Sequence, residues 1–257
     1  MCAIPSSRDV CVFLSRYGTA LIGCGATCIR LEKNVSRIAS AFGKSVEISV
    51  MPRHLYLTVS DSSDGTMFTS IATVPESALS FNVNTELSRL SWEISDGKID
   101  YARIENRFES IIGSDRQNKW LLLMLVSIAN ASFCRLFGGD YIAMLIVGVA
   151  TFIGFYLKTM LQSRHIDSRI IVAVCAFVSS VLGSTADLFD LGSTPALAIG
   201  TSVLYLVPGI PFLNSFSDLI YRHYICAVSR FFDALVLMCC ISTGLCAGML
   251  LMDVGMF

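Results

Sequence analysis

A short group of polar residues follows a predicted helix break in the C-terminal third of the chain. Pro208 and Pro211 flank Gly209 at the end of an apolar run, and a proline removes a backbone donor and clashes with the preceding turn of a helix. In lipid the freed carbonyls need protein or water partners, and broken helices build solute sites in many transporters. The residues expected to line a solute path are Thr194, Pro195, Pro208, Gly209, Pro211, Asn214, Ser215 and Asp218. The alternative is a helix that ends at Val207, before a turn at the cytoplasmic surface.

Charged residues near this stretch are candidates for proton coupling or for contact with an anion. Asp218, Arg222 and His223 follow the break, and Arg135 ends an earlier apolar run. An ionisable group inside a membrane is expensive and is a functional candidate when it faces the protein interior. Asp218 could equally be a solvated residue beside Arg222 on an interfacial helix, and Arg135 could extend its charge to the membrane surface.

Catalytic and metal-binding patterns are missing from the sequence. Cys24 and Cys28 are one helical turn apart, but no further Cys or His completes a ligand set. His54 has no accompanying Ser or Cys nucleophile motif, and no phosphate-binding loop is present. We therefore expect no catalytic residue, no metal and no cofactor.

The charged residues are distributed unevenly along the chain. The 257 residues are 54% hydrophobic and 15% charged, with a mean hydropathy of +0.65, whereas a soluble domain carries roughly 25% charged residues. Residues 1–118 hold 12 basic and 13 acidic side chains, and residues 119–257 hold 7 and 7. The sequence thus predicts a soluble domain over 1–118 and a membrane domain over 119–257. No basic run suggests nucleic acid as a partner.

The soluble part has the pattern of an α+β domain. Apolar spacing predicts helices over 9–20, 27–42, 84–95 and 98–112, and short alternating segments predict strands over 45–50, 54–61 and 67–74. Asp64-Gly65 is a hairpin signal between the last two strands. The N-terminus lacks the apolar core of a signal peptide, so we expect this domain in the cytoplasm.

The membrane part predicts five transmembrane helices, the fourth of them broken at Pro208–Pro211. The expected spans are 120–137, 141–161, 170–188, 195–213 and 231–252. Arg164, Arg169, Arg222 and Arg230 fall on one side together with the soluble domain, so the Lys/Arg bias places the N-terminus inside and the C-terminus outside. Gly244 and Gly248 form a small-residue pattern suited to helix packing. An odd number of spans in one short chain suggests a partner subunit.

Three segments resemble the threonine/serine exporter family. They are Phe133-Cys-Arg-Leu-Phe-Gly-Gly-Asp140, Gly192-Ser-Thr-Pro-Ala-Leu-Ala-Ile-Gly200 and Leu206-Val-Pro-Gly-Ile-Pro-Phe-Leu-Asn-Ser-Phe-Ser-Asp218. The chain is most similar to the larger subunit of the short, split form. The resemblance implies a bacterial inner-membrane protein that acts with a second small membrane subunit to export threonine, serine or a C4-dicarboxylate such as succinate. The expected partners are that subunit, the lipid bilayer, a small-molecule substrate and, by homo-oligomerisation, further copies of the chain.

Two other functions compete with that of an exporter subunit. The chain could be a sensory or assembly subunit, whose soluble domain binds a metabolite and gates a partner. It could also be a membrane-anchored hydrolase, although no nucleophile or metal signature supports one.

Overall fold

The computed structural model describes residues 5–61, 65–75, 79–114, 118–164 and 166–254. The chain forms two compact units, each of which is described by itself. Unit 1 contains residues 1–116 and 210–232, and unit 2 contains residues 117–209 and 233–257. Residues 210–232, predicted as part of the membrane domain, therefore pack with the N-terminal part of the chain. Asp64 of the predicted hairpin turn lies outside the described residues.

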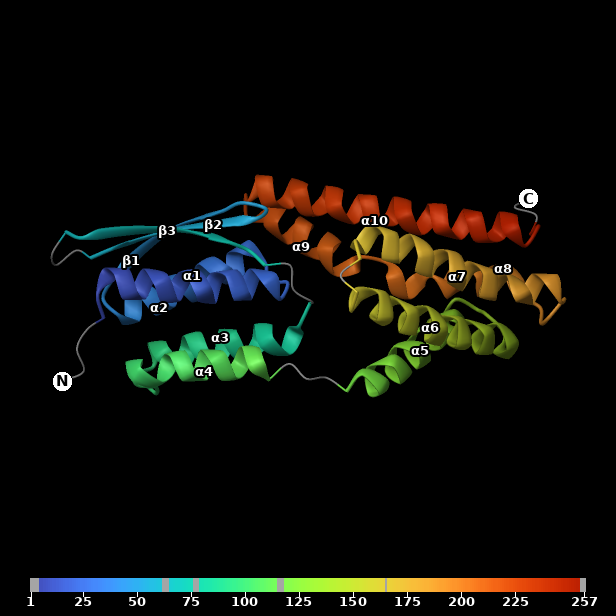
Figure 1. The fold of residues 1–257 in the computed structure, drawn as a ribbon, viewed down its shortest axis with the longest axis horizontal. Helices are drawn as coiled ribbons and strands as arrows, with labels where there is room; N and C mark the ends of the chain where they lie inside the picture. Colours follow the sequence, from blue (N-terminus) through green and yellow to red (C-terminus); the bar gives the residue numbers. More distant parts are fainter. Residues whose placement is uncertain (1–4, 62–64, 76–78, 115–117, 165, 255–257) are drawn as a thin grey trace. The chain divides into compact units, whose positions relative to one another are not determined.

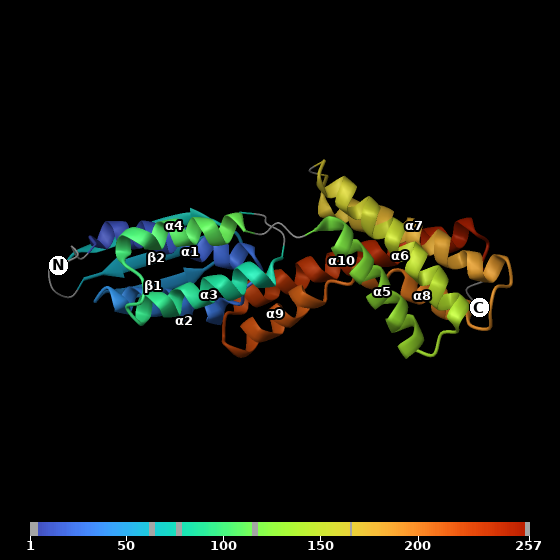
Figure 2. The same ribbon diagram turned by 90° about the horizontal axis from the view of Figure 1, so that it is seen from below.

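The N-terminal part of unit 1 is a three-layered α+β domain (Figure 1). Its sheet contains β1 (Ser45–Val50), β2 (His54–Ser60) and β3 (Met67–Thr73) in the order β1-β2-β3, and both pairings are antiparallel. Helices α1 (Ser7–Gly23) and α2 (Cys28–Ala41) form the middle layer. Helices α3 (Phe81–Ser95) and α4 (Tyr101–Gly113) form the third layer and lie side by side (Figure 2). The predicted helices and strands of this part are all present.

The core of this domain lies between α1 and the central strand. Leu55, Leu57 and Val59 alternate along β2 and are fully buried, while Tyr56 on the opposite face is exposed. Leu14 and Tyr17 of α1 join the same core. This is the period of two expected for a strand with one face covered. Buried apolar side chains thus hold the layers together.

Unit 1 also contains α9 (Gly209–Ile220) from its second residue onward and the first turns of α10 (Tyr224–Leu251). We predicted a span beginning at Phe231, but α10 begins at Tyr224. Arg230, in the added turns, pairs with Asp218 and donates to the Ala26 carbonyl, both in unit 1. A hydropathy pattern cannot register these long-range partners. We predicted a helix broken at Pro208–Pro211: the helical structure stops at Leu206 and resumes at Gly209, so the interruption lies at Pro208, whereas Pro211 lies in the first turn of α9. A proline is tolerated there because no intrahelical acceptor exists for the missing N–H.

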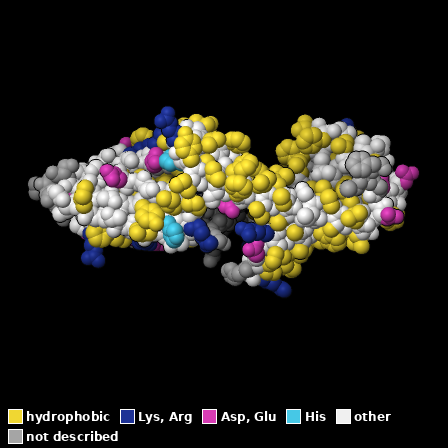
Figure 3. Space-filling view, turned by 90° about the horizontal axis from the view of Figure 1, so that it is seen from above, with side chains coloured by type: hydrophobic (Ala, Val, Ile, Leu, Met, Phe, Trp, Pro, Cys, Tyr) yellow, Lys and Arg dark blue, Asp and Glu magenta, His cyan; other side chains and the backbone are white. Residues whose placement is uncertain are grey.

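Among the described residues of unit 2, all regular secondary structure is helical. It contains α5 (Lys119–Leu136), α6 (Tyr141–Gln162), α7 (Ser168–Leu188), α8 (Pro195–Ser202), a short 3₁₀ turn (Leu204–Leu206) and the remainder of α10. Of the described helices, α5, α6, α7 and α10 are long and apolar enough to cross a membrane, and a broken pair made of α8 and α9 raises the total to five. Apolar side chains densely cover the face on which α10 lies (Figure 3). The chain is a multi-pass membrane protein with four or five candidate spans.

Candidate functional site

An amide in the interior of unit 2 connects three helices. Asn130 of α5 is 4% exposed, and its Nδ2 donates to Thr151 Oγ1 of α6 at 2.6 Å and to the Thr201 carbonyl of α8 at 3.1 Å. Thr201 is the second-last residue of α8, where carbonyls lose their intrahelical partners. Asn130 therefore satisfies part of the backbone that is freed where α8 ends.

A second polar contact joins α7 to the 3₁₀ turn that follows α8. Ser179 Oγ lies 3.0 Å from Tyr205 Oη. Gly154 of α6 makes room for this contact, because a Cβ at Gly154 would lie 2.0 Å from Tyr205 Oη and 2.6 Å from Ser179 Oγ. Any larger residue at this position would displace the tyrosine hydroxyl.

Further hydroxyl groups lie along α7 and α8 inside unit 2. Ser180, Ser184 and Ser202 are fully buried. Ser180 donates to the Leu245 carbonyl at 2.9 Å and Ser202 donates to the Ile199 carbonyl at 2.7 Å. Ser184 Oγ has no hydrogen-bond partner among the described residues. A buried polar atom without a partner is unusual and marks a position where a ligand or water could bind.

Asp218 is the centre of a different cluster, which lies in unit 1. It is fully buried, and its Oδ1 accepts from the Cys28 backbone N–H at 2.9 Å. Arg230 Nη1 lies 2.9 Å from Asp218 Oδ2, and Arg230 Nη2 donates to the Ala26 carbonyl at 3.0 Å. Thr27, the N-cap residue of α2, makes no side-chain cap. Asp218 therefore caps α2 from α9 and favours its positive end.

The burial of Asp218 excludes the solvated alternative considered from the sequence. It is neither solvated nor beside Arg222, since its partner is Arg230, twelve residues further along the chain. Arg222 is exposed and has a positive φ of 67°. His223 donates its backbone N–H to the Asp218 carbonyl at 2.8 Å, and its Nε2 lies 3.4 Å from Glu32 Oε1.

Neighbouring residues extend this cluster along one face of α9. Asn214 Nδ2 donates to the Gly25 carbonyl at 2.9 Å, and Ser215 Oγ donates to the Ala227 carbonyl at 2.7 Å. The structure thus brings together Asn214, Ser215 and Asp218. Thr194, Pro195, Pro208 and Gly209, predicted for the same path, belong to unit 2.

The Cys28 thiol lies within this cluster and contacts Cys226. The hydrogen bond with the Cys226 thiol, together with burial, raises the pKa of the Cys28 thiol. A raised pKa disfavours the thiolate, which is the reactive form of cysteine. Cys28 therefore fills space and donates its backbone N–H.

A third cluster lies at the turn between α5 and α6. Arg135 Nη1 donates to the Gly139 carbonyl at 3.0 Å, and its guanidinium lies 4.8 Å from the Tyr141 ring centroid. Asp140 N–H donates to Thr194 Oγ1 at 3.0 Å, and Asp140 accepts from the backbone N–H groups of Ala143 and Ser193. These two hydrogen bonds lower the pKa of Asp140. The cluster ties the start of α8 to the start of α6.

Sequence reasoning missed Arg230, Tyr205 and Ser179 as site residues. Arg230 was assigned to a polar link because it precedes a long apolar run. Tyr205 lies in an apolar run and has no distinguishing spacing. The available signal was the single basic residue, Arg230, within two helical turns of the predicted span at 231–252.

The sequence was compared with known families and proteins. The family model described as "Putative threonine/serine exporter" matches residues 12–252. The "Probable succinate transporter subunit YjjP" of Escherichia coli (strain K12) is 29% identical over 225 residues, which cover 87% of each chain. The protein of the same name from Klebsiella aerogenes is 28% identical over 223 residues, which cover 86% of this chain and 84% of that protein. No solved structure matches the chain.

All of these matches describe transport proteins, and none describes an enzyme. The family model covers most of the chain, including both units and every cluster described above. The chain therefore belongs to the threonine/serine exporter family and is a membrane transport protein.

Proposed function

We propose that this chain is the larger subunit of an inner-membrane secondary exporter for small polar metabolites, and that it acts with a second small membrane subunit of the same family. The substrates considered are C4-dicarboxylates such as succinate and the amino acids threonine and serine. The observation that carries the proposal is the set of buried amide and hydroxyl groups on α5–α8, within a chain whose family is one of exporters.

The polar interior of unit 2 suits a polar solute, which loses its hydration shell when it enters the membrane. In lipid a buried polar group is costly unless it has a partner, and such groups mark substrate pathways in membrane proteins. The side chains of Asn130 and Ser179 make hydrogen bonds that a solute could share, and the Ser184 hydroxyl, which has no partner among the described residues, could donate a hydrogen bond to a solute. We propose that the solute passes between α5, α6, α7 and α8 at these residues.

The choice of substrate is proposed from the relatives. Both relatives are named as probable succinate transporter subunits, and the description of the family names threonine and serine as exported solutes. A dicarboxylate would need cationic partners. Among the cations of unit 2, Arg135 of α5 already donates to the Gly139 carbonyl, and Lys158 of α6 is half-buried. Succinate is our first choice because both relatives are named probable succinate transporter subunits, and Lys158 is its proposed cation.

Energy coupling is proposed to use the proton-motive force. Asp218 and His223 are the candidates, because both ionisable side chains lie in the cluster on α9 and the start of α10. Replacing Asp218 by Asn keeps an oxygen that can accept from Cys28 but removes the charge. This variant should insert in the membrane and lose coupled export. Unchanged export would remove Asp218 from the mechanism.

The decisive experiment is efflux of labelled succinate, threonine and serine from cells that lack their own exporters. Three kinds of cell are compared: cells that express this chain alone, cells that express it together with a small membrane protein of the same family, and cells that express neither protein. Efflux of one solute only when both proteins are present supports the two-component exporter and identifies its substrate. No efflux of any solute, with both proteins inserted, contradicts the proposal.

A matched pair of variants tests the proposed path. Asn130→Ala removes the buried amide and should reduce efflux at least about tenfold, because a buried polar group loses a partner worth about 1–3 kcal/mol. Ser132→Ala, on the same helix but exposed, should leave efflux unchanged. Equal efflux by both variants would exclude the path through Asn130.

A further inference from the structure

A pocket of about 410 Å³ lies in the N-terminal domain. It is formed by α1, α3, α4 and Pro75. Its volume falls within the range of small-molecule sites, roughly 300–1,000 Å³. Most of its wall is apolar, through Ala20, Val83, Phe108 and Ile112.

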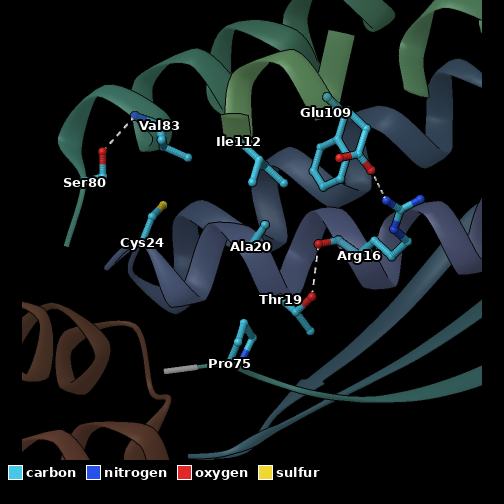
Figure 4. Close-up of a pocket in the computed structure, with 10 residues that line it drawn as sticks. Arg16, Thr19, Ala20, Cys24, Pro75, Ser80, Val83, Glu109 and Ile112 are labelled. Carbon is cyan, nitrogen blue, oxygen red and sulfur yellow. Dashed lines mark hydrogen bonds and ion pairs between the residues drawn. The ribbon is translucent and has the colours of Figure 1, made fainter. Parts of the chain in front are cut away.

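The polar groups of this pocket gather at its two ends (Figure 4). Arg16 and Glu109 lie at one end, Ser80 and Cys24 lie at the other, and Ala20 and Ile112 lie between them. A ligand here would need a charged group at one end and an apolar body beside it.

The charged end presents both signs to a ligand. Arg16 forms ion pairs with Glu109 and with Glu105, and its guanidinium lies 5.5 Å from the Phe108 ring centroid. A ligand with one charge would meet a repulsive neighbour at this ion pair. A zwitterion places its carboxylate beside the guanidinium and its ammonium beside Glu109.

The far end offers a hydrogen-bond donor. Ser80 is 4% exposed, and its Oγ accepts from the Val83 N–H at 3.3 Å. A serine hydroxyl can accept and donate at once. The Ser80 hydroxyl hydrogen can therefore be directed into the pocket. Because most of the wall is apolar, the main requirement on a ligand is still an apolar body.

We propose that this pocket binds a free α-amino acid with an apolar side chain of about the size of leucine. Arg16 receives the carboxylate, Glu109 receives the ammonium, and the side chain lies against Ala20, Val83 and Ile112. This site is separate from the proposed solute path, and the inference does not depend on the identity of the exported metabolite.

The test is calorimetric titration of the purified full chain in lipid nanodiscs with leucine. Two analogues of leucine isolate the charges: 4-methylpentanoate lacks the ammonium group and 3-methylbutan-1-amine lacks the carboxylate. Leucine should bind, and each analogue should bind at least about tenfold more weakly, since it loses a charge-assisted hydrogen bond. Equal binding of either analogue would overturn the zwitterion assignment.

Variants of the chain locate the site. Glu109→Gln should weaken leucine binding at least about tenfold. The matched control is Glu105→Gln, because Glu105 pairs with Arg16 in the same way but does not line the pocket. Ala20→Leu should fill the pocket and abolish binding, and thermal unfolding of each variant verifies that it is folded. A folded wild-type chain that binds no leucine, or binding that survives both Glu109→Gln and Ala20→Leu, would refute the proposal.

Leucine binding and solute efflux are measured by separate assays. The titration reports binding to the N-terminal domain, and the efflux assay reports movement of solute. Loss of efflux with intact leucine binding would contradict only the exporter proposal. Efflux without leucine binding would contradict only this one.

Discussion

At the scale of single residues, fully buried Asp218 and partly buried Arg230 form an ion pair that joins α9 and α10 to the N-terminal end of α2. Breaking a buried ion pair leaves an uncompensated charge and costs about 3–5 kcal/mol. Asp218→Ala should therefore lower the thermal unfolding temperature of the purified chain markedly. The double variant Asp218→Ala/Arg230→Ala should recover part of the loss, because no unpaired charge remains.

The control for this prediction is Asp233→Ala. Asp233 is exposed and lies on the same helix as Arg230, so its loss should change the unfolding temperature little. An Asp218→Ala variant as stable as Asp233→Ala would show that the pair contributes nothing to stability.

Asp140 provides a prediction on pH at the same scale. Its pKa is lowered from the ordinary 3.8 by backbone hydrogen bonds from Ala143 and Ser193. A lowered pKa means that the charged form stabilises the fold above about pH 4, and that this contribution is lost as the pH falls through the lowered value. Asp140→Asn mimics the neutral form.

The measurement is the difference in unfolding temperature between wild type and Asp140→Asn as a function of pH. Wild type should be the more stable at neutral pH, and the difference should vanish in strong acid. A difference that is constant with pH, or that grows as the pH falls, would contradict the assigned hydrogen bonds.

At the scale of the helices, α6 approaches the 3₁₀ turn closely because residue 154 is a glycine. A Cβ there would lie 2.0 Å from Tyr205 Oη, far inside normal contact. Gly154→Ala should force Tyr205 away from Ser179 and reduce both folded yield and efflux. Overpacking of this kind typically costs about 1–3 kcal/mol.

Gly148 is the matched control on the same helix. A Cβ at Gly148 would lie 3.6 Å from Ala131 Cβ, an ordinary contact, so Gly148→Ala should be tolerated. Adding Tyr205→Phe to Gly154→Ala removes the nearest clashing atom and should restore part of the yield. Equal yields from Gly148→Ala and Gly154→Ala would show that this part of α6 is loosely packed.

At the scale of the whole molecule, the role of α8 and α9 decides the topology. If the pair crosses the membrane once, the chain has five spans and its ends lie on opposite sides. If the pair returns to the side on which it entered, four spans remain and both ends lie on the same side. We predict five spans, with the N-terminus in the cytoplasm, from the Lys/Arg bias.

Reporter fusions test this topology. Alkaline phosphatase fused after residue 254 should be active, since that enzyme works only outside the cytoplasm, and a fluorescent protein fused at the N-terminus should be bright. An inactive phosphatase fusion on a stably inserted chain would support four spans instead.

The sequence alone determined the elements whose signals are local. Alternation of apolar residues located β2, and apolar length located α5, α6 and α7 within one or two residues. These patterns depend only on neighbouring residues, because a strand has a period of two and a span needs about 20 apolar residues. The three motif segments also sufficed to indicate the family, which the family model then confirmed.

Only the tertiary structure decided which residues meet. Cys28 and Asp218 are 190 positions apart, and no local pattern records that α9 caps α2. Asn130 and Thr201 are 71 positions apart, and their contact depends on how α5 and α8 pack. Thr194 and Asp218, both predicted for the solute path from the helix break, belong to different units, and a path that includes both stays a prediction. Periodicity determines which face of an element is buried, but long-range packing determines what lies against that face.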